Sequence, residues 1–176
     1  MLAGLDLGSQ LSGWCVGDGA SVPIAGAWAF HQVEDDLGAL GVQLWDDLDR
    51  LHRRFGLTQI VYEAPIFVPG DKLLKLRKLY GMGVVVETWA RKNGVACNEA
   101  SVKALKRRLA GAAGASKDDM VWAAEKMGVV LPEQINQGRR DAADAVAAWL
   151  VAVQFYARTH LSRWDRVLYS ARGALL

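Results

Sequence analysis

An acidic residue stands inside the apolar stretch that opens the chain. Residues 2–8 read Leu-Ala-Gly-Leu-Asp-Leu-Gly, so Asp6 lies within a predicted β-strand that is otherwise apolar. A carboxylate in such a place is costly unless a cation or hydrogen-bond donors replace the water that it loses. The stretch therefore predicts either a divalent metal bound by Asp6 or a capping role for Asp6 at the turn around Gly8 and Ser9.

The pattern along the rest of the chain predicts an α/β fold with a mixed sheet. Gly17-Asp18-Gly19 is typical of a hairpin between two of the first three strands, and helices and strands alternate after them. Leucine spacing gives the helix over 37–55 one apolar face, and Asp47 is expected on its outer face. The expected strands are 2–8, 12–17, 22–30, 59–62 and 95–98, and the expected helices are 37–55, 72–92, 102–109, 117–127 and 140–158.

The length of 176 residues suits one domain, expected over 1–158, followed by a basic tail over 159–176. Cys15 and Cys97 form no CxxC motif, which argues against a disulfide framework or a zinc site and favours a reducing, cytoplasmic setting. No basic flank precedes an apolar run at the start, so no signal peptide is expected. The apolar stretch 142–157 contains Asp144, so we expect no membrane span.

The net charge of +2 conceals a strong asymmetry along the chain. Residues 1–63 hold 3 basic and 9 acidic residues, a net charge of −6, whereas residues 64–176 hold 18 and 10, a net charge of +8. Such basic clusters indicate either solvated helix faces or a surface for a phosphate backbone, and several clusters together favour the second. The clustered residues are Lys72, Lys75, Arg77, Lys78, Lys103, Lys106, Arg107, Arg108, Arg139 and Arg140.

Three further acids stand in unusual contexts. Glu63 ends a short apolar strand, because Pro65 cannot continue a central strand. Asp141 and Asp144 are three residues apart, which puts them on one face of an otherwise apolar helix. Simpler explanations exist for each: Glu63 could pair with Arg139 or Arg140, and acids are favourable at a helix N-terminus. Four acids in such places together favour a site for hard divalent cations, which prefer oxygen ligands.

Three motifs resemble the RuvC family of Holliday junction resolvases, in the RNase H-like superfamily. Residues 4–14, Gly-Leu-Asp-Leu-Gly-Ser-Gln-Leu-Ser-Gly-Trp, resemble the family's opening strand and turn. Residues 61–65, Val-Tyr-Glu-Ala-Pro, resemble its second acidic strand end, and residues 140–147, Arg-Asp-Ala-Ala-Asp-Ala-Val-Ala, its closing acidic helix. The resemblance covers nearly the whole chain. It implies an RNase H-like fold with a five-stranded mixed sheet and helices on both faces.

The resemblance also implies an activity and a set of site residues. The family's four metal-binding acids fall on Asp6, Glu63, Asp141 and Asp144, which would hold two Mg²⁺ or Mn²⁺ ions. The implied reaction is hydrolysis of phosphodiesters in a four-way DNA junction by a homodimer, leaving 5′-phosphate and 3′-hydroxyl ends. A partner that drives branch migration stays open. The candidate DNA contacts, from the resemblance and from the basic clusters, are Phe67, Lys72, Lys75, Lys103, Lys106, Arg107, Lys117 and Arg140.

Three other functions stay open from the sequence. One is a related nuclease acting on flaps, other branched DNA or structured RNA. A second is an actin-like or sugar-kinase ATPase, whose first phosphate loop also reads Asp-x-Gly-[Ser/Thr], but the chain is short for that two-domain fold and has no second Gly-rich loop. The third is a DNA-binding protein without catalysis.

The tryptophans and two glycines complete the predictions. Trp164 in the tail, beside Arg163 and Arg166, is expected to contact DNA or a partner. Gly81 and Gly83 on the helix over 72–92 favour either the two-fold interface of a dimer or packing on the chain's own sheet. The other tryptophans considered are expected in the core or an interface: Trp28, Trp45, Trp89, Trp122 and Trp149.

Overall fold

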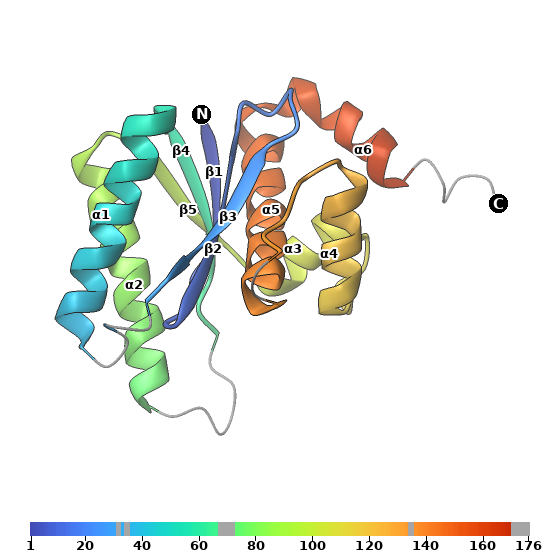
Figure 1. Cartoon of the computed structure of the whole chain (residues 1–176). Helices are drawn as coiled ribbons and strands as arrows, with labels where there is room; N and C mark the ends of the chain where they lie inside the picture. Colours follow the sequence, from blue (N-terminus) through green and yellow to red (C-terminus); the bar gives the residue numbers. More distant parts are fainter. Residues whose placement is uncertain (31–32, 34–35, 67–72, 134–135, 170–176) are drawn as a thin grey trace.

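A five-stranded mixed sheet forms the centre of the computed structural model, which describes residues 1–30, 33, 36–66, 73–133 and 136–169 (Figure 1). The strand order is β3-β2-β1-β4-β5, with β1, β2 and β3 antiparallel and β1, β4 and β5 parallel. The strands are β1 (Leu2–Asp6), β2 (Leu11–Gly17), β3 (Ile24–Ala29), β4 (Gln59–Glu63) and β5 (Ala96–Ala100).

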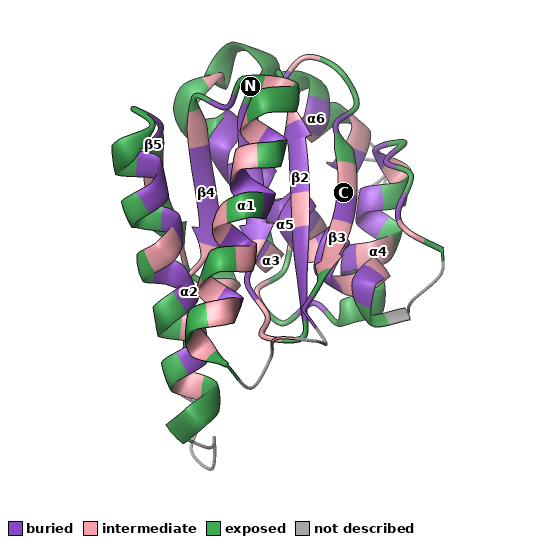
Figure 2. Ribbon diagram, turned by 60° about the vertical axis from the view of Figure 1, so that its left-hand side comes forward, coloured by how far each residue is buried: buried purple, intermediate pink, exposed green. Residues whose placement is uncertain are grey.

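Helices cover both faces of this sheet. Helices α1 (Leu37–Phe55) and α2 (Leu73–Lys92) pack on one face, and the others pack on the opposite face. Figure 2 shows β2 and β4 largely buried between these two layers. The α/β prediction and the RNase H-like arrangement of the sheet are thus confirmed. The helices of the second layer are α3 (Val102–Ala110), α4 (Lys117–Lys126), α5 (Asn136–Tyr156) and α6 (Leu161–Tyr169), with a short 3₁₀ turn at Arg158–His160.

The predicted elements are present with shifted ends, and the local chemistry explains several boundaries. Asp36 caps α1 by accepting a hydrogen bond from Ala39 N, and Ser101 caps α3 in the same way. Ser116 and Asp119 form a capping box at the start of α4. The prediction for Asp47 is wrong: this residue is buried, and Arg50 donates a hydrogen bond of 2.5 Å to it.

Helix α5 lies directly against the backbones of the central strands. A Cβ atom at Gly4 of β1 would lie 2.2 Å from the carbonyl oxygen of Ala145, and one at Gly13 of β2 would lie 1.9 Å from that of Asp141. Both distances are far below any real contact, so only glycine permits this approach. The two glycines therefore fix how close the start of α5 comes to the end of β1.

The residues after position 158 contain a further helix. Over 161–169 they form α6, which packs on the core with Trp164 and Leu168 buried. The Trp164 indole donates to Gly19 O at 2.7 Å and makes an edge contact with Trp149. Trp164 is thus a core residue, and its prediction as a DNA or partner contact is wrong. Residues 170–176 lie outside the described residues.

Trp122, expected in the core or an interface, does not lie in the core. Its side chain is 61% exposed on α4, where the Lys126 ammonium lies 5.2 Å from the ring centroid. Trp89 and Trp149 are fully buried as expected. Over the described ranges, no helix is long and apolar enough to cross a membrane.

Candidate active site

The four predicted acids meet at one end of the sheet. Asp6 ends β1 and Glu63 ends β4, and these strands are parallel neighbours whose register pairs Leu5 with Tyr62. The start of α5 brings Asp141 and Asp144 to the same place, where β1 and β4 finish (Figure 1). Burial raises the pKa of Asp6 most, and the negative charges of the other three acids raise it further, as expected for carboxylates that share one site.

Burial is the main cause of the electrostatics of this cluster. It raises the pKa of Asp6 well above its usual value and also raises the pKa of Asp144. Burial followed by the charge of Asp144 raises the pKa of Glu63 to about 7. The pKa of Asp141 rises to about 6, again chiefly through burial. Four carboxylates with raised pKa values form a site that a cation would stabilise.

Two side chains partly offset the negative charge. Lys117 Nζ lies 3.8 Å from Asp144 Oδ2, and its ammonium lowers the pKa of all four acids. Gln137 Nε2 donates a hydrogen bond of 2.5 Å to Asp141 Oδ1, which lowers the pKa of Asp141. Gln137 was not among the predicted site residues. Its position one helical turn before Asp141 is the signal that could have identified it.

The simpler explanations for Asp6 and Glu63 are wrong. Ser12, not Asp6, closes the turn after β1: its hydroxyl accepts from Gly8 N and donates to Gly8 O, both at 3.0 Å. The arginines predicted as partners of Glu63 have other partners, since Arg139 pairs with Glu125 and Arg140 pairs with Asp118.

The donor set fits hard divalent cations by its chemistry. All four side chains offer only carboxylate oxygens, the ligand type that Mg²⁺ and Mn²⁺ prefer. Within the described part of the chain, no three acidic, histidine or cysteine side chains already form a group that could hold an ion. Lys117 and Gln137 contact two of the four carboxylates, Asp144 and Asp141.

A cleft with two lobes runs past the acids. One lobe, of about 520 Å³, contains Asp6 and Asp141 together with the turn over residues 7–11. The other, of about 390 Å³, contains Asp6, Glu63 and residues 64–66. Lys75, Leu79 and Lys117 line both lobes, so the cleft has basic side chains on either side of Asp6.

The other predicted DNA contacts that the structure describes are not among the residues that line this cleft. Lys103 and Arg107 are exposed on α3. Lys106 is half-buried, and its ammonium donates to Ala115 O at 2.7 Å. Arg140 is held by Asp118 at 3.2 Å. Phe67 and Lys72 lie outside the described residues.

Comparison with known proteins gives similarity at the level of structure. No protein-family model matches the sequence, and no curated protein matches it significantly. The structure of RuvC from Thermus thermophilus matches over 90% of this chain and 95% of that chain, with a TM-score of 0.67 and 19% identity. The T. thermophilus RuvC in complex with a Holliday junction substrate matches over 91% and 96%, with a TM-score of 0.71 and 19% identity.

A third solved structure extends the similarity beyond bacteria. The yeast mitochondrial Holliday junction resolvase Ydc2 matches over 98% of this chain and 81% of that chain, with a TM-score of 0.58 and 15% identity. These identities establish a shared fold. The described chain therefore has the RNase H-like fold of the RuvC-type Holliday junction resolvases, with four acids gathered at the end of its central strands.

Proposed function

We propose that this protein is a metal-dependent endonuclease that resolves four-way DNA junctions by nicking two strands. The observation that carries the proposal is the convergence of Asp6, Glu63, Asp141 and Asp144 on a fold shared with junction resolvases. The acids come from two strands and a helix that are far apart in the sequence. Packing alone gives no reason to bury four carboxylates together, and a binding site for cations does.

The chain's own residues provide binding and orientation in this mechanism. When bound, two Mg²⁺ or Mn²⁺ ions supply Lewis-acid activation of water and stabilise negative charge on the phosphodiester. The four carboxylates would hold these ions, and the Gln137 amide orients Asp141. The Lys117 ammonium, at the junction of the two lobes, can bind a non-bridging phosphate oxygen. We expect 5′-phosphate and 3′-hydroxyl products.

A branched DNA substrate and a dimer belong to the same proposal. A complex of T. thermophilus RuvC with a Holliday junction supports the substrate class. A two-fold dimer would place two such clefts on one junction and cut two strands symmetrically. The exposed side of α2 is the candidate interface, whereas Gly83 packs on Tyr62 of the chain's own sheet. The two free thiols, Cys15 and Cys97, support the proposed cytoplasmic setting.

The test is cleavage of a labelled four-way junction by the wild-type protein and by Asp6→Asn in Mg²⁺. We expect Asp6→Asn to lower the cleavage rate by at least about 10³-fold, because removing one carboxylate ligand disrupts the metal site. Junction affinity and thermal stability should be retained. Asp46→Asn, on the exposed side of α1, is the matched control and should cleave normally.

Substrate competition separates the proposal from its alternatives. Flaps, linear duplexes and structured RNA are compared with the junction at equal concentration. Preferential cleavage of flaps or RNA would assign the same site to a different nuclease. An Asp6→Asn protein that cuts at the wild-type rate would contradict the metal site itself.

A further inference from the structure

We propose that Lys106 is a positioning residue that fixes the start of α4, and with it Lys117, against the carboxylates. The inference rests on the proposed nuclease function. It reassigns a lysine that the sequence placed among the phosphate contacts. Lys103, one turn earlier on the same helix, keeps the role of phosphate contact.

The hydrogen bond of Lys106 spans the connection between α3 and α4. Its Nζ donates at 2.7 Å to the carbonyl oxygen of Ala115, a buried residue. Ser116 follows as the N-cap of α4, and Lys117 is the first residue of that helix. The ammonium of Lys106 therefore holds the backbone two residues before the lysine that approaches Asp144.

The connection needs such a hydrogen bond. It contains Gly111, which ends α3 with a left-handed backbone, and Gly114, whose surroundings are open. Glycines leave a backbone with many accessible conformations, so the segment does not determine the direction of α4 by itself. A charged donor on a buried carbonyl is among the stronger hydrogen bonds available to a loop.

Lys103 and Lys106 differ in their surroundings although both lie on α3. Lys103 is exposed, as is Arg107. Lys106 is half-buried, and its charge also lowers the pKa of Glu63 and of Asp144. Its ammonium thus lies between the Ala115 carbonyl and the carboxylates. A side chain in this position is directed toward the protein, whereas Lys103 is directed toward solvent.

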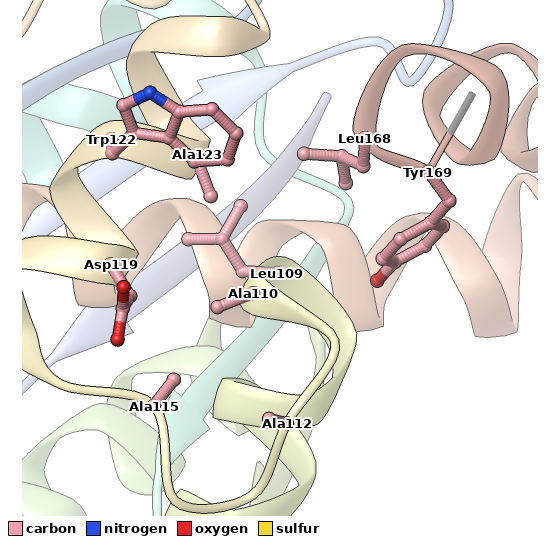
Figure 3. A pocket seen from close by; sticks show the side chains of 9 residues that line it. All are labelled: Leu109, Ala110, Ala112, Ala115, Asp119, Trp122, Ala123, Leu168 and Tyr169. Carbon is pink, nitrogen blue, oxygen red and sulfur yellow. The ribbon is translucent and has the colours of Figure 1, made fainter. Parts of the chain in front are cut away.

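Contacts independent of Lys106 hold α3 and α4 on the domain. Asp165 of α6 pairs with Arg108 of α3 at 2.5 Å, and Lys126 of α4 donates to Leu168 O of α6 at 3.0 Å. Figure 3 shows Tyr169 and Leu168 of α6 around a small cavity with Leu109 and Ala115. Because these contacts remain when Lys106 changes, its replacement should leave the domain folded and alter the start of α4 only.

The first measurement is amide hydrogen exchange of full-length protein without DNA or metal. In Lys106→Met, which keeps the aliphatic stem, we expect exchange at residues 115–118 to accelerate by at least about 10-fold, because the hydrogen bond to Ala115 is lost. Exchange in α5 and the thermal midpoint should not change. Lys103→Met is the matched control and should exchange as the wild type does. Unchanged exchange at 115–118 in Lys106→Met would overturn the proposal.

The second measurement separates positioning from phosphate contact on a four-way junction. Lys103→Met should weaken junction binding and lower the slope of log K against log salt by about 0.9, as the loss of one phosphate contact predicts. Lys106→Met should lose at least about 10-fold in cleavage rate at saturating enzyme, since Lys117 is misplaced. Lys106→Arg, which retains a donor, should recover part of that rate.

The outcomes distinguish this inference from the proposed function. If Lys106→Met lowers the salt slope as Lys103→Met does and cleaves normally at saturation, Lys106 is a phosphate contact and the inference is wrong. If wild-type protein cleaves no junction while exchange at 115–118 still accelerates in Lys106→Met, the proposed function fails and the placement of α4 by Lys106 stands.

Discussion

At the scale of single residues, the acids of the candidate site lower the stability of the folded state. Burial and mutual repulsion raise the pKa values of Glu63 and Asp141 to about 7 and about 6, so ionised carboxylates destabilise the folded state near neutral pH. Lys117 and Gln137 offset only part of this cost. A site that lowers stability without its ligand is expected where binding or catalysis has been selected.

The first residue-scale prediction concerns Glu63→Gln in a chelating buffer. Glu63 has a folded-state pKa of about 7 against an ordinary value of 4.5. Above about pH 7, Glu63 is therefore ionised in the folded state, and its charge destabilises that state. As the pH falls, Glu63 takes up its proton at a higher pH in the folded state than in the unfolded state. We expect Glu63→Gln to raise the free energy of unfolding at pH 8 by roughly 1–3 kcal/mol, which urea denaturation can measure.

The pH dependence provides the control for that prediction. The stability of the wild type should rise as the pH falls from 8 toward 4.5, and the rise should be smaller in Glu63→Gln. Glu133→Gln changes an exposed glutamate and should leave the curve unchanged. Parallel curves for wild type and Glu63→Gln would contradict the raised pKa.

The sequence could identify a site residue when the residues next to it in the chain made it unusual. The four acids stand out because an apolar strand or helix surrounds each, which is a local pattern. Lys106 does not stand out, because its role depends on the Ala115 carbonyl nine residues later. Long side chains reach partners that local sequence does not specify.

At the scale of elements, the approach of α5 to β1 and β2 builds the site. Gly4 and Gly13 leave no side chain between the sheet and the helix, and Asp141 stands directly over Gly13. The resemblance of residues 4–14 and 140–147 to known motifs predicted that these segments share a site. The resemblance did not predict that glycines on β1 and β2 set the distance between these strands and α5. An apolar run alone does not specify which strand a helix contacts.

Gly13→Ala tests this contact. The new Cβ would meet the Asp141 carbonyl at 1.9 Å, and both partners are backbone that cannot move aside cheaply. We expect a loss of at least about 3 kcal/mol in stability or failure to fold, measured by denaturation and by expression of folded protein.

The matched control uses another glycine in a regular element. Nothing lies within 4 Å of a Cβ at Gly81, in the middle of α2. Gly81→Ala should therefore change stability little or raise it by up to about 1 kcal/mol. Equal effects of the two substitutions would contradict the close packing of α5 on the sheet.

Helix α6 shows why a short terminal element escapes sequence interpretation. Its nine residues include Arg163, Asp165 and Arg166, and they were predicted only as part of a basic tail. The structure places Trp164 and Leu168 on one face, four residues apart, where they contact the core. Over so few residues, an amphipathic helix and a basic tail have nearly the same composition.

At the scale of the whole molecule, the two faces of the domain differ in what covers their outer helices. On the α5 side, α3, α4 and α6 pack on one another and on α5. On the opposite side, α2 carries apolar side chains that face solvent: Leu73 is 73% exposed, Tyr80 52% and Val84 61%. Their spacing of seven and four residues puts them on one face of the helix. Such a stripe on a helix is typical of an interface.

We expect this stripe to form the two-fold contact of the proposed dimer, so Val84→Glu should produce a monomer in sedimentation equilibrium. In a two-fold contact the substitution places a carboxylate on each of the two facing copies of α2. Burying these carboxylates without a cationic partner costs several kcal/mol. The monomer keeps its own four acids and should still nick one strand of a junction. Simultaneous nicking of two strands, followed on a supercoiled cruciform plasmid, should fall by at least about 10-fold, because each dimer brings two clefts to one junction.

Val130→Glu is the matched control for this change. Val130 is 83% exposed and follows α4, on the side of the domain away from α2. Its substitution adds the same charge without touching the stripe, and should leave both the assembly and paired nicking intact. A Val84→Glu protein that remains dimeric would place the interface elsewhere, while a monomer that still nicks two strands together would show that pairing of clefts is unnecessary for resolution. Dimer assembly and cleavage chemistry are thus tested separately, because Val84 is on α2 whereas the four acids are on β1, β4 and α5.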